Sequence, residues 1–160
     1  MLGFLKKKAA PELAAPIAGQ IVAIENVSDP LFAQKAMGEG FGIIPQGDTV
    51  VAPVAGTVTS VFKTKHAIGI ATAEGLELLL HIGLDTVNLE GVPFTMLIKQ
   101  GDDVAVGTPL VRVDFDQIKA ADLDPIVLTL VTNSPDKLAA VQYASGTVQP
   151  GDSVATLKLK

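Results

Sequence analysis

The two histidines of this 160-residue chain, His66 and His81, are the residues whose types and spacing could do chemistry. Each lies in a stretch of strand-like composition, residues 64–72 and 76–82, and a short loop with glycine separates the stretches, which is typical of a β-hairpin. Either two-residue loop within residues 73–75 places the imidazoles on one face, directly opposite or diagonal. A three-residue loop places them on opposite faces, because a slip of one residue inverts a strand.

Thr64 and Asp85 accompany the histidines. Thr64 shares strand parity with His66, so its hydroxyl can join the pair, and Asp85 follows His81 by four residues. Such a cluster suits a sparse metal site, general acid–base catalysis, or nucleophilic catalysis. In the nucleophilic role, one neutral imidazole attacks phosphorus while the second histidine and the threonine stabilise the transferred oxygens. Histidines that only pack or face solvent are a fourth interpretation, and these residues alone leave all four open.

The remaining composition excludes most other chemistry. The chain has no cysteine, which excludes disulfides, thiolate zinc sites, iron–sulfur clusters and cysteine nucleophiles. It also has no serine in a nucleophile elbow and no P-loop. The net charge of −5, a single arginine (Arg112) and 4% aromatic residues argue against nucleic-acid binding. A hydrophobic content of 48% excludes a disordered chain.

Repeated sequence motifs indicate many short strands. The phrase Ala-Pro-x-Ala-Gly begins at Ala15 and again at Ala52, each time before an alternating stretch. A Gly-Asp turn followed by a valine-containing stretch occurs three times, starting at Gly47, Gly101 and Gly151. This pattern predicts an all-β protein, an antiparallel β-sandwich or barrel of many short strands.

Helix is expected only as single turns. The candidates are residues 29–37, residues 116–121 after an acidic cap, and residues 134–140 with Ser134 as N-cap and Pro135 at the first helical position. None of these segments is long enough to organise the fold.

The chain divides into an N-terminal tail, residues 1–13, and a single domain, residues 14–160. The tail has its apolar residues before its lysines, which reverses the order of a signal peptide, so we expect a cytoplasmic protein. No apolar run is long enough to span a membrane. Phe4 and the lysines of the tail allow at most a peripheral membrane contact.

The segment that starts at His81 reads His-Ile-Gly-Leu-Asp-Thr-Val-Asn-Leu-Glu-Gly-Val-Pro-Phe. It closely resembles the signature around the phosphorylated histidine of the glucose-type enzyme IIA family of the bacterial phosphoenolpyruvate:sugar phosphotransferase system. Other stretches resemble family landmarks in the family's order, namely residues 15–19, 27–35, 37–40, 51–57 and 64–70. The resemblance covers about residues 14–160, far more than one motif.

The resemblance implies a β-sandwich-like phosphocarrier without a cofactor. In that pattern His81 takes a phosphoryl group from the histidine-phosphorylated protein HPr, becomes a transient phosphohistidine, and passes the group to a cysteine on the IIB domain of a sugar permease. His66 corresponds to the second histidine, which stabilises the phosphoryl group, and Thr64 orients His66. The Gly83 carbonyl would fix the tautomer of His81.

The resemblance also implies a docking surface for two partners in turn. Asp85 and Asp29 match acidic positions that flank the family's site and suit basic residues on HPr. A transient interface needs a small apolar patch with charge at its rim. Our candidates for that patch are Phe32, Met37, Phe62 and Leu79. Further regulatory protein partners are compatible with such a surface.

Two other functions compete with this interpretation. A biotinyl- or lipoyl-type carrier domain has similar strand entries and Gly-Asp turns, but it needs a modified lysine with a flanking signature that Lys63, Lys65 and Lys99 lack. A zinc hydrolase on a related β scaffold would hold stoichiometric zinc. We expect no intrinsic metal, although paired His66 and His81 could capture zinc adventitiously.

Overall fold

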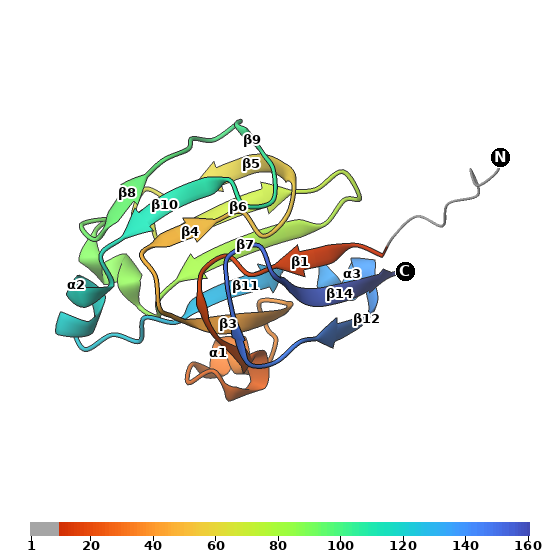
Figure 1. Ribbon diagram of the computed structural model, residues 1–160, viewed down its shortest axis with the longest axis horizontal. Coiled ribbons are helices and arrows are strands. Elements are labelled where there is room, and N and C mark those ends of the chain that lie inside the picture. Colours follow the sequence, from red (N-terminus) through yellow and green to blue (C-terminus); the bar gives the residue numbers. More distant parts are fainter. Residues whose placement is uncertain (1–9) are drawn as a thin grey trace.

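Antiparallel strands in three sheets dominate the computed structural model, which describes residues 10–160 (Figure 1). The largest sheet has eight strands in the spatial order β13 (Thr147–Val148), β2 (Gly19–Ala23), β3 (Glu39–Pro45), β11 (Val127–Val131), β7 (Glu77–Ile82), β6 (Ala67–Ala71), β5 (Gly56–Val61) and β9 (Asp103–Val104). The second sheet contains β4 (Thr49–Val51), β10 (Pro109–Val113) and β8 (Phe94–Met96). The third contains β1 (Glu12–Ala14), β14 (Ser153–Leu159) and β12 (Leu138–Tyr143). The predicted all-β class is confirmed.

One hydrophobic core joins the three sheets. Ile43, Ile68 and Leu80 come from the large sheet, Val111 comes from β10, and Leu157 comes from β14, and all five are buried together. Burial of such aliphatic side chains contributes about 25 cal/mol per Å² of apolar surface. The core therefore lies between sheets, as in a sandwich.

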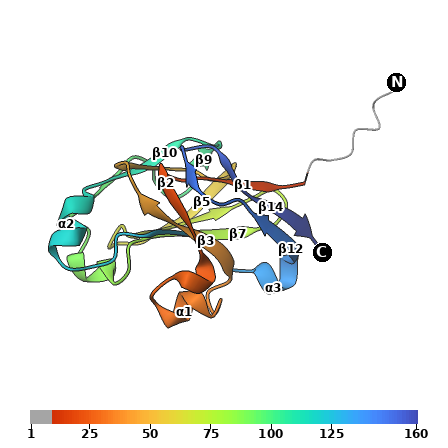
Figure 2. The same ribbon diagram turned by 60° about the horizontal axis from the view of Figure 1, so that its bottom comes forward.

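The opposite face of the large sheet carries a second, smaller cluster. Phe32 and Ile24 pack there against Leu84, Leu128 and Leu130. Phe32 belongs to the short helix α1 (Pro30–Ala33), and Ile24 belongs to the 3-10 turn η2 (Ile24–Asn26). Figures 1 and 2 show α1 at the lower side of the molecule, close to β3. This packing fixes the segment around α1 over the sheet.

The first and third helices are shorter than the sequence predicts, and the second is shifted by one residue. α1 ends at Ala33, and Lys35 follows with a left-handed φ of +61°. α2 (Phe115–Ala120) has Asp114 as its N-cap. α3 (Ser134–Lys137) has Asn133 rather than Ser134 at the N-cap position.

The predicted continuation of the third helix to residue 140 is wrong. Leu138 already has extended backbone, and β12 (Leu138–Tyr143) pairs with β14. Pairing with a strand distant in sequence outweighs the local helix preference here. A further 3-10 turn, η3 (Thr86–Leu89), follows β7.

The repeated sequence motifs precede the starts of strands, as predicted. Each Gly-Asp pair directly precedes a strand, namely β4, β9 and β14, and the two Ala-Pro-x-Ala-Gly phrases lead into β2 and β5. β1 begins at Glu12, two residues inside the segment expected to be a tail, and its Leu13 is buried. Residues 1–9 of that tail lie outside the described residues. Among residues 10–160, no helix is long and apolar enough to cross a membrane.

Candidate active site

β7 presents His81 on the face of the large sheet that α1 partly covers. Burial alternates along this strand, so Leu78, Leu80 and Ile82 point into the core and His81 points the other way. The strand ends at Ile82, and the next residue, Gly83, has a φ of +74°, which glycine adopts without strain. The Gly83 carbonyl oxygen lies 2.8 Å from Nδ1 of His81. Because a carbonyl only accepts, Nδ1 carries the proton and Nε2 keeps its lone pair.

His66 lies in the turn before β6 rather than within a strand. β6 starts at Ala67, which pairs with His81, and residues 73–75 form a three-residue loop. A three-residue loop predicts imidazoles on opposite faces of the hairpin, and that prediction is wrong. Strand parity does not apply to His66, because Lys65, with a φ of +62°, turns the backbone just before it.

Two contacts, one from β7 and one from the turn itself, hold His66. Its carbonyl oxygen accepts a hydrogen bond from the backbone N–H of Ile82, 2.8 Å away. Its Nδ1 lies 2.7 Å from the hydroxyl oxygen of Thr64. When that hydroxyl donates to Nδ1, the ring proton of His66 is on Nε2. Thr64 can therefore orient His66, although the two residues share a turn rather than a strand.

The two imidazoles meet edge to face. Their ring centres are 5.1 Å apart with an angle of 81° between the planes. Burial is the main cause that lowers the pKa of both His66 and His81 below the usual 6.5, and the charge of His81 lowers the pKa of His66 further. The Gly83 carbonyl, followed by Asp29 and Asp85, raises the pKa of His81 in part but does not cancel the effect of burial. Both rings are therefore mainly neutral at pH 7.

A pocket of about 180 Å³ opens over this pair. Both histidines line it, His66 with only 6% of its surface exposed and His81 partly exposed. Phe32 packs against the ring of His81 at 5.0 Å, and Phe62 packs edge-on against His66 at 5.5 Å. An incoming group therefore reaches His81 more easily than His66.

The predicted docking residues occupy different environments. Phe62 is 44% exposed and stands beside His66. Phe32 is buried, with 5% of its surface exposed, and belongs to the smaller core cluster. Met37 and Leu79 are half-buried at the margin of that cluster. Only Phe62 of these four is a large exposed hydrophobic side chain.

Two exposed apolar residues, Leu31 and Val87, are not among the predicted docking residues. Both line the pocket over the histidines, with 50% and 45% of their surface exposed. Leu31 is next to Phe32 on α1, so burial of Phe32 turns Leu31 outward. The sequence signal that could have indicated Leu31 is the helix start at Asp29-Pro30, which fixes the first turn of α1.

Asp29 and Asp85 border the same pocket. Asp29 is the N-cap of α1, and its Oδ1 accepts a hydrogen bond from the Leu31 N–H at 2.9 Å. Asp85 lies between Gly83 and η3 with a φ of +60°. The rim of the pocket is thus apolar with two carboxylates.

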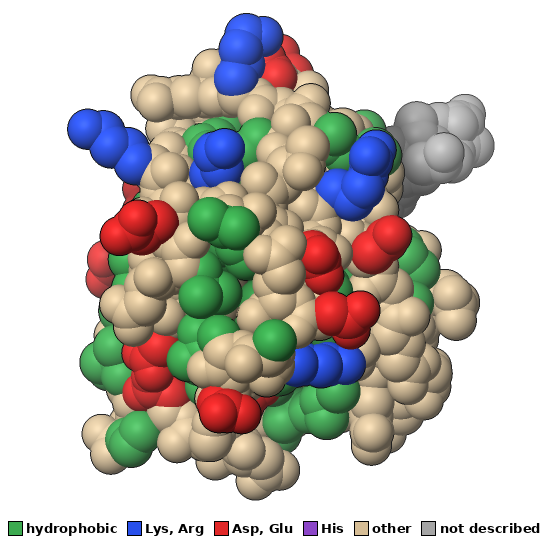
Figure 3. Space-filling view, turned by 90° about the vertical axis from the view of Figure 1, so that its left-hand side faces the viewer, with side chains coloured by type: hydrophobic (Ala, Val, Ile, Leu, Met, Phe, Trp, Pro, Cys, Tyr) green, Lys and Arg blue, Asp and Glu red, His purple; other side chains and the backbone are tan. Residues whose placement is uncertain are grey.

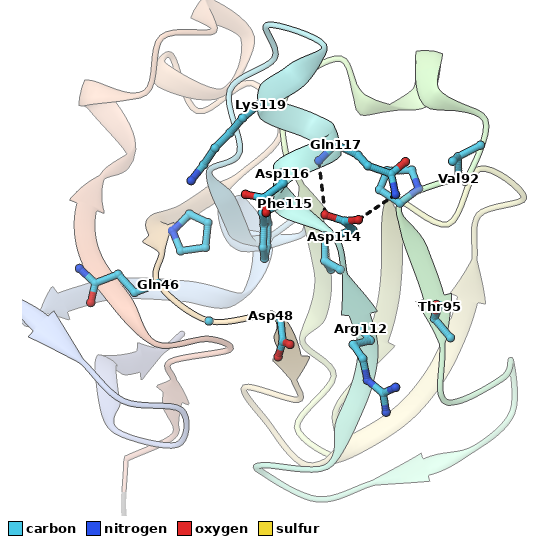
Figure 4. A pocket seen from close by; sticks show the side chains of 14 residues that line it. Gln46, Asp48, Val92, Thr95, Arg112, Asp114, Phe115, Asp116, Gln117 and Lys119 are labelled. Carbon is cyan, nitrogen blue, oxygen red and sulfur yellow. Dashed lines mark hydrogen bonds between the residues drawn. The ribbon is translucent and has the colours of Figure 1, made fainter.

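A larger cavity of about 640 Å³ lies elsewhere, between β10, α2 and the turn before β4 (Figure 4). Figure 3 looks onto the side that carries α2, where hydrophobic side chains form a central strip bordered by acidic and basic ones. In this cavity Asp114 accepts hydrogen bonds from Gln117 of α2, the main cause that lowers its pKa. Asp114 thus acts as a helix cap, and the cavity contains neither histidine.

The described part of the chain contains no group of three or more His, Cys, Asp or Glu side chains arranged to hold a metal. His66 and His81 supply two nitrogen ligands at most. Adventitious zinc capture by this pair stays a prediction.

The geometry defines a class of protein: a β-sandwich that offers a neutral, oriented imidazole beside a second one. Residues 11–137 match the family model described as phosphoenolpyruvate-dependent sugar phosphotransferase system, EIIA 1. The chain therefore belongs to this EIIA family, which confirms the resemblance seen in the sequence.

Individual relatives agree. The glucose-specific EIIA component of Staphylococcus aureus (strain COL) is 48% identical over 87% of this chain and 84% of its own length. The beta-glucoside-specific EIIBCA component of Bacillus subtilis (strain 168) is 49% identical over 89% of this chain, which spans only 24% of that relative. The solved glucose permease IIA of Mycoplasma capricolum is 37% identical, with a TM-score of 0.84 over 99% of this chain and 100% of the other. These matches give no support to a biotinyl- or lipoyl-type carrier or to a zinc hydrolase.

Proposed function

We propose that this protein is a cytoplasmic phosphocarrier of a sugar phosphotransferase system, with His81 as the residue that carries the phosphoryl group. The observation that carries the proposal is the hydrogen bond between Nδ1 of His81 and the Gly83 carbonyl. It leaves Nε2 as a neutral nucleophile in a pocket beside His66.

In the first step, Nε2 of His81 attacks the phosphorus of phosphohistidine on HPr. A new P–N bond forms to His81 and the P–N bond to the donor breaks. The donor imidazole keeps the electron pair and takes a proton from solvent, because His81 keeps the proton on its Nδ1. The carrier mainly aligns the attacking and leaving atoms and stabilises the oxygens in between. His66, with its proton on Nε2, would donate to one of those oxygens, and Thr64 would hold it in this tautomer.

In the second step, a cysteine thiolate of a IIB domain attacks the phosphorus, and the P–N bond to His81 breaks. The absence of cysteine from this chain is consistent with an acceptor thiol on a partner. The name EIIBCA of one relative joins this kind of module to B and C components in one chain. The exposed Leu31, Val87 and Phe62, together with Asp29 and Asp85, would meet both partners in turn.

Labelling with phosphoenolpyruvate, enzyme I and HPr tests this function. The purified protein should acquire about one equivalent of acid-labile, alkali-stable phosphate, and a IIB domain should then remove it. His81→Ala should abolish labelling, whereas Thr129→Val, a buried change in β11, should leave it intact. Labelling that persists in the His81 variant would sink the assignment.

A further inference from the structure

Thr86 is the first residue of η3 and the only fully buried polar side chain in the stretch that leaves β7. Its surface is 0% exposed. A buried hydroxyl without a partner costs about 1–3 kcal/mol, so its hydrogen bond matters. The hydroxyl donates to the carbonyl oxygen of Ile82. Ile82 stands between His81 and Gly83, the two residues joined by the orienting hydrogen bond.

Thr86 also packs against Gly83. A methyl group added to Gly83 would overlap the γ-methyl group of Thr86. The hydroxyl of Thr86 thus closes a loop over residues 82–86, and its methyl group fills the space inside that loop. Two residues of the loop, Gly83 and Asp85, have left-handed backbone, a conformation that the contacts of Thr86 help to hold.

The outer side of the turn is held by a different segment. The N–H groups of Gly83 and Leu84 donate to the carbonyl oxygens of Ile126 and Asp124, at 2.8 and 2.9 Å. These bonds fix the N–H groups but leave the Gly83 carbonyl free to accept from His81. The direction of that carbonyl depends on the torsion angles on either side of it, and Thr86 restrains them from the inner side.

We propose that Thr86 is a positioning residue, which locks the turn after β7 so that the Gly83 carbonyl holds His81 in the tautomer with a free Nε2. This inference rests on the proposed function for its consequence, phosphoryl transfer, but its structural part can be measured without any transfer. Thr86 itself lies behind the turn and does not line the pocket over the histidines.

The decisive variant is Thr86→Val, which removes the hydroxyl and keeps the methyl group and the volume. Thr86→Ser keeps the hydroxyl and should behave like the wild type. Thr129→Val is a matched control, because Thr129 is also 0% exposed and its hydroxyl has no hydrogen-bond partner. Nitrogen-15 NMR of the imidazoles reports the tautomer of His81, and single-turnover labelling from phospho-HPr reports the rate.

We expect Thr86→Val to mix the two tautomers of His81 and to slow phosphoryl acceptance roughly tenfold or more, since small displacements of a nucleophile are costly. Thr86→Ser and Thr129→Val should keep the Nδ1-protonated ring and the wild-type rate. A pure Nδ1–H tautomer in folded Thr86→Val would overturn the inference, as would a mixed tautomer in folded Thr86→Ser if the valine variant does not fold. Failure of the wild type to accept phosphate would instead overturn the proposed function, and the NMR result would still decide the role of Thr86.

Discussion

The two histidines are chemically alike in sequence, and their surroundings make them different. His81 has its Nδ1 bound to a backbone carbonyl and its ring partly exposed, so its Nε2 can attack an incoming phosphorus. His66 is buried and has its Nδ1 against the Thr64 hydroxyl, so when that hydroxyl donates, Nε2 of His66 carries the ring proton and can donate it to a group in the pocket. In the proposed mechanism, the hydrogen-bond partner and the exposure of each ring, rather than the residue type, separate the nucleophile from the stabilising residue.

Burial of both rings makes stability depend on pH. In the unfolded chain each imidazole titrates near 6.5, and in the folded protein the pKa of each is lower. Below 6.5 the unfolded state therefore binds more protons, and acidification favours unfolding. We predict that the free energy of unfolding in urea falls between about pH 7.5 and about pH 5, and that the His66→Gln/His81→Gln double variant loses less over this range. An equal loss in both proteins would contradict the burial of neutral rings.

Removal of the second imidazole should affect the two transfer steps unequally. An anionic thiolate attacks in the onward step, so negative charge at the phosphoryl group is greatest there and a donor from His66 matters most. We predict that His66→Ala still accepts phosphate from HPr but passes it to IIB roughly a hundredfold more slowly. Single-turnover rates of both steps measure this, with circular dichroism as the check on folding. Equal slowing of both steps would argue against a selective role in onward transfer.

Two turns, rather than a regular strand or helix, do most to shape the site. Residues 83–85, two of which have left-handed backbone, follow β7 and place the carbonyl that binds His81. The turn before β6 holds Thr64 and His66. The strands supply a rigid base for both turns, because β7 pairs on both sides, with β6 and with β11.

Gly83→Ala tests this turn. Alanine at a φ of +74° is strained, and its methyl group would overlap Thr86. Gly101→Ala is the control, because Gly101 also has a positive φ, +95°, but nothing lies within 4 Å of an added methyl group. We predict that Gly83→Ala lowers the free energy of unfolding by at least about 1 kcal/mol more than Gly101→Ala does. Gly83→Ala should also lose the tautomer of His81 with the proton on Nδ1, whereas Gly101→Ala should keep it. Equal stability and the same tautomer in the two variants would contradict the packing of Gly83 against Thr86.

Local signals predicted the strands well and their ends less well. The Gly-Asp turns and the alternating stretches depend on neighbours in sequence, so β4, β9 and β14 could be anticipated at Gly47, Gly101 and Gly151. The segment after Lys137 could not, because its strand conformation comes from pairing with β14. The hairpin of β6 and β7 was correct in outline, but the conformation of Lys65, which decides the place of His66, has no simple sequence signal.

Considered as a whole molecule, the protein concentrates its candidate contacts around one small pocket. Exposed Leu31, Val87 and Phe62 surround the histidines, and two carboxylates lie among them. A small apolar patch with a charged rim favours brief association, which suits a carrier that must release each partner. Leu31 and Phe32 are neighbours on α1, but Phe32 is buried and Leu31 is exposed, so it is Leu31 that adds exposed apolar surface to this patch.

A charge placed in this patch should impair docking without affecting the chemistry. We predict that Val87→Asp raises the KM for phospho-HPr by roughly tenfold with little change in kcat, because apolar contact is lost in both ground and transition states. Val106→Asp is the matched control, since Val106 is 51% exposed and does not line the pocket over the histidines. Similar kinetics for the two variants would remove Val87 from the docking surface.

The candidate site could be predicted from the sequence mainly through the motif around His81. Residue chemistry alone left four roles open for the histidines, because neither spacing nor composition reports a tautomer. The Gly83 carbonyl, the exposure of Leu31 and Val87, and the contact between Thr86 and Ile82 depend on how the chain turns in space. Tertiary structure was needed for each of them.

Locating the phosphate on the phosphorylated protein tests the central claim most directly. The protein, labelled with nitrogen-15 in histidine and phosphorylated through HPr, can be studied by phosphorus and nitrogen NMR, which distinguish the two ring nitrogens and the two histidines. We predict one phosphoryl group on Nε2 of His81, with Nδ1 still protonated and His66 unmodified. Phosphate on Nδ1 of His81, or on either nitrogen of His66, would contradict the proposed mechanism.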